Sequence, residues 1–102
     1  MPTLHTVNKS PFERSTLDSC LRVAQPDSAI LFIEDGVVAA LKNTAASKKV
    51  EQAKSRCKLY VLGPDLKARG LREEQLIDGL SVIDYAGFVD LAASHDRVQA
   101  WL

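Results

Sequence analysis

The chain has 102 residues, with 13 Lys and Arg against 13 Asp and Glu, so its formal net charge at pH 7 is zero. A chain of this length predicts one domain, which we expect to span residues 1–102. The charge balance argues against a general nucleic-acid binder, which needs a basic excess. The absence of an apolar run of about 18 residues argues against a membrane span.

The N-terminus and the cysteines indicate the compartment. The first residues, MPTLHTVNKSPF, lack the charged and then apolar layout of a signal peptide. The sequence has two cysteines, Cys20 and Cys57, which are too few for a disulfide framework. We therefore expect a cytoplasmic protein with reduced thiols.

A strand and then a helix are predicted first. Residues 3–7 read as the strand and residues 10–24 as the helix, which has two possible starts. Ser10 has the spacing of a capping box, with proline at the first helical position, whereas Ser15 offers a second, shorter start.

The middle of the chain predicts a buried strand and its connections. Residues 29–34 are apolar almost throughout, as expected of a strand that is buried on both faces, and Asp35 and Gly36 end it. A short helix is expected over residues 37–41. Residues 43–54 are polar and weakly patterned, which predicts a surface helix or loop.

Strands and helices continue to alternate in the second half. Strands are predicted at residues 58–63, 80–85 and 97–102, and helices at residues 64–69 and 85–95. Proline opens the first of these helices and glycine follows it.

The last predicted helix and strand carry many apolar side chains. Asp84 is expected to cap the helix. Four apolar residues of this helix are expected to face the sheet: Phe88, Val89, Leu91 and Ala92. The final strand is short and carries Val98, Trp101 and Leu102, which predicts a sheet edge or a contact with another chain.

Strands that are separated by helices predict an α/β fold. We expect one small domain with a mostly parallel sheet of about five strands and helices on both faces, similar to flavodoxin and Rossmann folds. Neither a G-x-G-x-x-G loop nor a P-loop occurs, and His5 and His95 have no companion ligands at metal-binding spacing. No cofactor and no metal are therefore expected. Asp35, Asp65 and Asp84, near strand ends, are first of all expected to be caps and turn formers.

Cys20 is the candidate site residue. Leu17, Cys20, Leu21 and Ala24 have the spacing of an apolar helix stripe, which is typical of a packed thiol. If the helix starts at Ser15, however, Cys20 lies within about two turns of the positive helix end. A partly exposed thiol there could ionise and carry a persulfide, so both interpretations stay open.

Cys57 lies within a basic cluster. The cluster, which we call the basic cluster 48–58, consists of Lys48, Lys49, Lys54, Arg56 and Lys58. It predicts either a solvated surface or a docking patch for an acidic partner. Neighbouring cations favour a thiolate at Cys57. Because this residue precedes its strand, on the side opposite the usual ligand face, it ranks below Cys20.

Four segments together resemble the DsrH/TusB family: LHTVNKSPF, FIEDGVVAAL, VLGPDLKARGL and IDYAGFVDLAASHDRVQAW. They cover nearly the whole chain. The resemblance implies a DsrE-like fold and a place in a cytoplasmic sulfurtransferase complex that relays persulfide sulfur. It also implies a heterohexamer that holds two copies each of this chain and of DsrE- and DsrF-like subunits, without a cofactor and without direct contact to nucleic acid.

The family has two branches. In the DsrEFH branch the sulfur serves sulfur oxidation and passes to a DsrC-type acceptor, whereas in the TusBCD branch it ends in 2-thiouridine of tRNA. The resemblance implies a TusA-like donor and a DsrC- or TusE-like acceptor. The main sulfur carrier belongs to the DsrE/TusD-type subunit. DsrH chains resemble this one in having a cysteine at position 20, which favours DsrH with Cys20 as a secondary persulfide carrier. The alternatives are a TusB-like subunit or a non-catalytic structural subunit.

Overall fold

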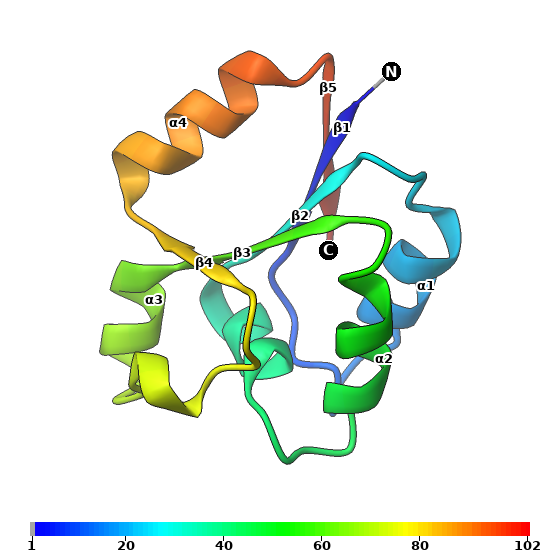
Figure 1. Ribbon diagram of the computed structural model, residues 1–102. Coiled ribbons are helices and arrows are strands. Elements are labelled where there is room, and N and C mark those ends of the chain that lie inside the picture. The colour runs from blue at the N-terminus through cyan, green and yellow to red at the C-terminus, as the bar shows by residue number, and fades with distance from the viewer. Residues whose placement is uncertain (1) are drawn as a thin grey trace.

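The computed structural model describes residues 2–102, which form a single small domain (Figure 1). This part of the chain contains five strands: β1 (Thr3–Val7), β2 (Ala29–Phe32), β3 (Lys58–Leu62), β4 (Ser81–Ile83) and β5 (Arg97–Trp101). They form one sheet in the order β4–β3–β2–β1–β5, and every neighbouring pair is parallel. The predicted α/β fold is therefore confirmed, and β5 is an edge strand as expected.

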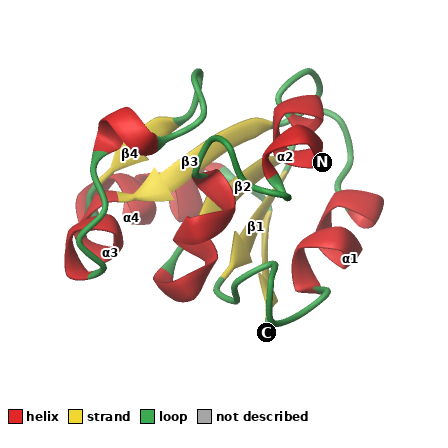
Figure 2. Ribbon diagram, turned by 90° about the horizontal axis from the view of Figure 1, so that it is seen from below, coloured by secondary structure: helices red, strands yellow, loops and turns green. Residues whose placement is uncertain are grey.

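Helices lie on both faces of the sheet, as predicted, but in unequal number. Residues 2–102 contain α1 (Thr16–Val23), η1 (Glu34–Ala40), α2 (Ser47–Ala53), α3 (Gly63–Ala68), η2 (Glu73–Gln75) and α4 (Tyr85–Ser94), where η denotes a 3₁₀ helix. α1, α2 and α3 lie on one face, and α4 alone lies on the other (Figures 1 and 2). None of the helices in the described residues is long and apolar enough to cross a membrane.

The larger part of the core lies between the sheet and α1–α3. Successive strand residues point to opposite faces, so Ile30 and Phe32 pack on this side while Leu31 packs on the other. The α4 side holds a small buried cluster of Leu4, Ala29, Leu31 and Leu62. The first face of the sheet is therefore closed by the chain itself, and the second face only in part.

α1 begins at the later of its two predicted starts. Ser10 forms a separate turn instead, because its carbonyl accepts hydrogen bonds from the N–H groups of Glu13 and Arg14, both at 3.1 Å. The Ser10 hydroxyl accepts the N–H of Phe12 at 3.2 Å. These local bonds close the turn before the helix starts at Thr16, after Ser15.

η1 approaches the end of β1 closely. A Cβ atom at Gly36 would lie 2.0 Å from the carbonyl oxygen of Val7, so only glycine fits at this crossing. β2 ends at Phe32, earlier than predicted, and residues 35–36 lie inside η1 instead of ending the strand. The predicted short helix is present, but it starts earlier, at Glu34, and has 3₁₀ geometry. The sequence did not predict η2.

α4 starts as predicted but presents a different face. The Asp84 carboxylate accepts a hydrogen bond from the N–H of Gly87 at 2.8 Å, which caps the helix. Phe88, Leu91 and Ala92 pack against the sheet, but Val89 is 67% exposed. The prediction that Val89 faces the sheet was wrong, since each residue turns a helix by about 100° and Val89 falls on the flank.

Candidate functional site

Cys20 lies in the core. It follows Leu17 by one turn of α1, and its exposed fraction is 0%. Burial is the main cause that raises the pKa of the Cys20 thiol from 9.0 to about 12, and a charged Cys57 adds to this while Arg56 opposes it. The thiol is therefore protonated at neutral pH. This placement agrees with the packed interpretation of the apolar stripe.

Cys57 lies just before β3, close to the surface. Its Sγ–H donates to the carbonyl oxygen of Gln25 at 3.6 Å. The residue lines a hollow of about 280 Å³ together with Lys54, Arg56 and Lys58. Burial raises the pKa of Cys57, whereas Arg56 lowers it, so a neighbouring cation favours the thiolate as predicted but burial outweighs this effect.

Arg56 ties α1 to the segment before β3. Its guanidinium donates to the carbonyl oxygens of Leu21 and Ala24, each at 2.8 Å. Carbonyl groups at a helix C-terminus lack helical partners, and a cation there also interacts favourably with the helix dipole. One member of the basic cluster 48–58 therefore positions the helix that carries Cys20.

Two of the three aspartates near strand ends form hydrogen bonds between η1 and α3. Asp35 Oδ1 accepts from Arg69 Nη2 at 2.8 Å, and Asp65 Oδ2 accepts from the N–H of Glu34 at 2.6 Å. Glu34 has a φ of 50°, a left-handed conformation that this bond helps to fix. Asp84 caps its helix as predicted, whereas Asp35 and Asp65 join η1 to α3 through these contacts.

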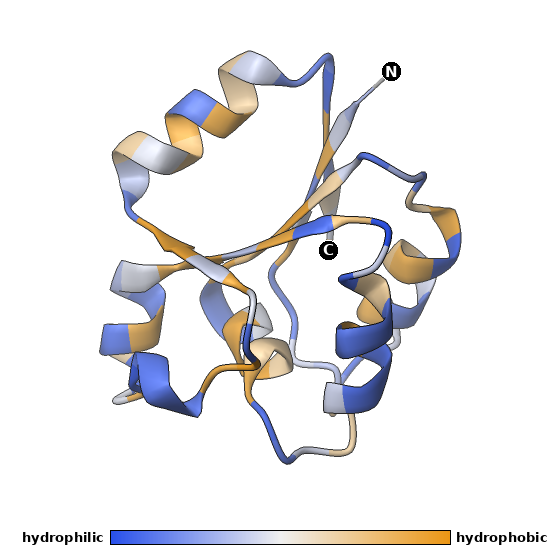
Figure 3. Ribbon diagram, viewed as in Figure 1, coloured by the Kyte–Doolittle hydropathy of each residue, from blue (hydrophilic) through white to orange (hydrophobic). Residues whose placement is uncertain are grey.

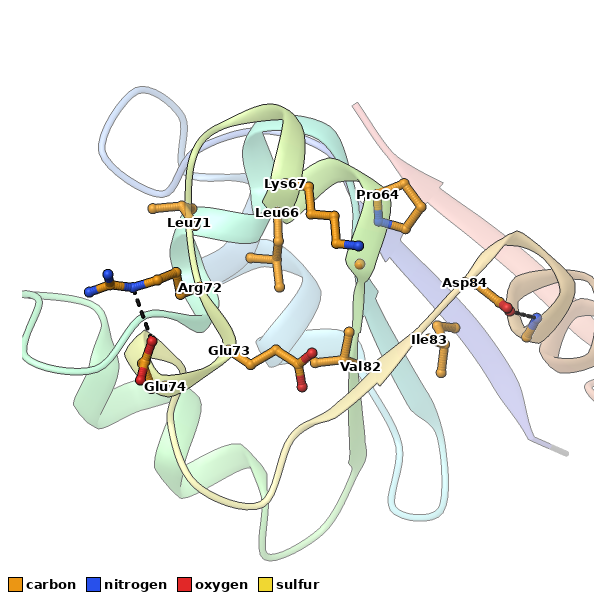
Figure 4. Close-up of a pocket in the computed structure, with 12 residues that line it drawn as sticks. Pro64, Leu66, Lys67, Leu71, Arg72, Glu73, Glu74, Val82, Ile83 and Asp84 are labelled. Carbon is orange, nitrogen blue, oxygen red and sulfur yellow. Dashed lines mark hydrogen bonds and ion pairs between the residues drawn. The ribbon is translucent and has the colours of Figure 1, made fainter.

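A wide hollow of about 1290 Å³ lies between α3, the η2 segment and β4 (Figure 4). Leu66, Leu71 and Val82 contribute apolar surface, while Lys67 and Glu73 are charged. Neither cysteine lines it. The hollow therefore does not bring a thiol together with a substrate-sized cavity.

The two histidines have structural partners. His5 is buried, and its Nδ1 accepts a hydrogen bond from Trp101 Nε1 at 3.0 Å. His95 Nδ1 lies 2.7 Å from the carbonyl oxygen of Leu91. Within residues 2–102, no group of three or more His, Cys, Asp or Glu side chains could hold a metal ion.

Residues 9–98 match the family described as "DsrH like protein". The chain is 38% identical to "Protein TusB" of Pectobacterium parmentieri and 39% identical to "Protein TusB" of Yersinia enterocolitica. Both alignments span 98 residues, which is 96% of this chain and 99% of each relative. The chain belongs to the DsrH/TusB family.

Solved structures agree with this family's fold. The ychN protein from E. coli superposes with a TM-score of 0.84 at 19% identity, over 98% of this chain and 99% of that one. Protein MTH1491 from Methanobacterium thermoautotrophicum gives a TM-score of 0.73 at 13% identity, over 96% of this chain and 97% of that one. This DsrH/TusB chain thus has the ychN-like, DsrE-type fold.

The DsrH/TusB chain exposes apolar side chains along its last two elements. None of the residues of α4 is buried, although the helix is apolar on more than one side (Figure 3). The large exposed residues on α4, on β5 and directly after β5, which we call the α4–β5 residues, are Tyr85, Val89, Val98 and Leu102. The sequence pointed to Val98 and Leu102 but missed Val89. The exposure of Val89 could have been predicted from the number of apolar residues in α4, which is larger than one face of the helix can hold.

Proposed function

We propose that this DsrH/TusB chain is a structural subunit of a cytoplasmic sulfur-relay complex that serves 2-thiouridine synthesis in tRNA. The observation that carries the proposal is the exposure of the α4–β5 residues. An apolar helix without a buried residue is typical of a surface that another protein covers.

The names of the relatives favour the tRNA branch. The main prediction from sequence was the DsrEFH branch, with sulfur oxidation and a DsrC-type acceptor, and it depended on the presence of Cys20. The relatives that match the chain at 38–39% identity over almost its whole length are named TusB. We therefore prefer the TusB alternative, with a TusA-like donor and a TusE-like acceptor serving the complex as a whole.

The partners that we propose are DsrE- and DsrF-like subunits in a heterohexamer with two copies of each chain. α4 packs its residues Phe88, Leu91 and Ala92 on the sheet and still leaves Val89 exposed. β5 leaves one edge of the sheet without a neighbour among the described strands. Zero net charge fits an apolar protein contact better than a contact with RNA.

Cys20 as a persulfide carrier remains the second candidate. A carrier thiolate must reach the terminal sulfur of a donor persulfide. In the described fold the Cys20 thiol is fully buried and its pKa is raised to about 12. A carrier role therefore requires that α1 opens, and the role stays a prediction.

The experiment measures assembly and sulfur transfer with matched variants. Val89→Asp is compared with Val23→Asp, since both valines lie on helices and are 67% and 53% exposed. We expect Val89→Asp to lower co-purification with the DsrE- and DsrF-like subunits by at least about tenfold, because burying a carboxylate costs well over 1.4 kcal/mol. Val23→Asp should assemble normally.

The same complexes report on Cys20. We expect Cys20→Ser complexes to assemble and to keep 2-thiouridine formation in tRNA. Normal assembly of Val89→Asp would reject α4 as the contact surface. Loss of thiolation in an assembled Cys20→Ser complex would instead establish the carrier role.

A further inference from the structure

The two cysteines lie on the same side of the sheet although 37 positions separate them in the sequence. Both belong to the core cluster between the sheet and α1–α3. Cys20 contributes from the middle of α1, and Cys57 contributes from the residue before β3. The fold thus gathers both thiols of the chain on one side of the sheet.

Three hydrogen bonds hold the two segments together. Arg56 donates to the carbonyl oxygens of Leu21 and Ala24, and Cys57 donates to that of Gln25. The N–H of Ala24 in turn donates to the carbonyl oxygen of Cys20 at 2.8 Å, which places Ala24 one turn after Cys20. The Cys57 segment is therefore fixed against the turn of chain that follows Cys20.

The two thiols differ in access. Cys57 lines the hollow of about 280 Å³ with Lys54, Arg56 and Lys58, whereas Cys20 lines neither this hollow nor the one between α1 and α2. A small reagent from solvent reaches Cys57 first. The thiols also interact electrostatically, because a negative charge on Cys57 would raise the pKa of Cys20.

We propose that Cys57 and Cys20 form a dithiol site that a peroxide closes to an intramolecular disulfide, with Cys57 oxidised first. The Cys57 sulfur attacks hydrogen peroxide, an S–O bond forms, the O–O bond breaks, and water leaves. The product is a sulfenic acid at Cys57, and the peroxide is reduced by two electrons. The Cys20 sulfur then attacks the Cys57 sulfur, the S–S bond forms, and the departing hydroxide takes the Cys20 proton and leaves as water.

The disulfide would fasten the C-terminal half of α1 to the start of β3 by a covalent bond. Because burial raises the pKa of Cys57, the first step is slow at neutral pH and accelerates as the pH rises toward that pKa. The inference does not depend on the proposed function, since it concerns the thiol chemistry of the purified full chain.

The experiment exposes the folded full chain to hydrogen peroxide and then alkylates the remaining thiols in denaturant. Mass spectrometry should find a monomer that is lighter by two hydrogen atoms and takes up no alkyl group. Its digest should contain one cross-linked pair of peptides with Cys20 and Cys57. In Cys20→Ala, dimedone should capture a sulfenic acid at Cys57. In Cys57→Ala, Cys20 should remain a free thiol.

Several results would overturn the proposal. They are separate oxidation of the two cysteines without a cross-link, a disulfide between two chains only, and no reaction at all. Equal oxidation of Cys20 in Cys57→Ala would overturn the order of the steps. If Cys20→Ala fails to fold by circular dichroism, the wild-type cross-link and the Cys57→Ala variant still decide.

Discussion

His5 is kept neutral by its surroundings. Trp101 Nε1–H donates to His5 Nδ1 at 3.0 Å, which requires that Nδ1 carries no proton. The residue is 4% exposed, and burial lowers the pKa of His5 from its usual 6.5. Protonation would place two donors against each other at the contact between β1 and β5.

This contact predicts a loss of stability in mild acid. The folded pKa of His5 lies below the unfolded value of 6.5, so the unfolded chain takes up the proton first. The contribution of neutral His5 to the stability of the folded state is complete above pH 6.5 and is lost as the pH falls through the folded pKa. Its size is about 1.4 kcal/mol for each unit by which the folded and unfolded pKa values differ.

Urea unfolding on either side of pH 6.5, followed by the fluorescence of the single tryptophan, measures the effect. His5→Gln should flatten this part of the pH dependence. An identical pH dependence in the wild type and in His5→Gln would contradict the prediction.

The sequence favoured a buried Cys20 without deciding it, and it did not give the ionisation of Cys57. Four apolar residues at helical spacing are typical of a packed Cys20, but they left a partly exposed thiol open. For Cys57, cations adjacent in sequence suggested a lowered pKa. The pKa of Cys57 depends on two opposing quantities, namely how far burial removes the thiol from water and how close the guanidinium of Arg56 lies. Sequence spacing contains neither quantity.

The N-cap of α4 yields a prediction at the scale of one element. Asp84→Ala removes the bond to the N–H of Gly87 and should lower the free energy of unfolding by about 1 kcal/mol. Asp90→Ala, on the exposed side of the same helix, is the matched control and should change stability by less than about 0.5 kcal/mol.

Denaturant unfolding compares the two variants, and Asp84→Asn should retain most of the cap because an amide oxygen also accepts. Equal losses for Asp84→Ala and Asp90→Ala would mean that the cap contributes nothing.

Helix boundaries depended on local bonds that the sequence only partly specifies. Ser10 and Ser15 offered two starts for α1, and both had a physical reason. The turn at Ser10 decided between them, since its carbonyl and hydroxyl oxygens accept the nearby N–H groups. The cap at Asp84 had no such competitor, so its prediction from sequence was correct.

At the scale of the whole molecule, the alternation of strands and helices predicted the parallel sheet but not the order of its strands. Apolar runs indicate which segments are buried and do not indicate which neighbours they choose. The pairing of β5 with β1, from Thr3 to Arg97, joins opposite ends of the described chain. A distant pairing of this kind leaves no pattern in one sequence.

Zero net charge and exposed apolar residues predict self-association of the isolated chain. Its pI is about 6.7, so mutual repulsion is smallest near that pH. Light scattering of the chain without partners should be largest there. Val89→Asp should reduce the scattering more than Val23→Asp, which changes the charge equally. Equal effects of the two variants would assign the association to charge alone.

The adjacency of β1 and β5 sets an order of events in folding. β1 meets β2 across 25 residues, from Leu4 to Ala29, but meets β5 across 94 residues, from Thr3 to Arg97. The entropy of loop closure makes the second pairing more costly by about 1 kcal/mol, if the chain between is disordered. β1–β4 can therefore assemble as chain synthesis proceeds, with one side of β1 open, and β5 closes that side last.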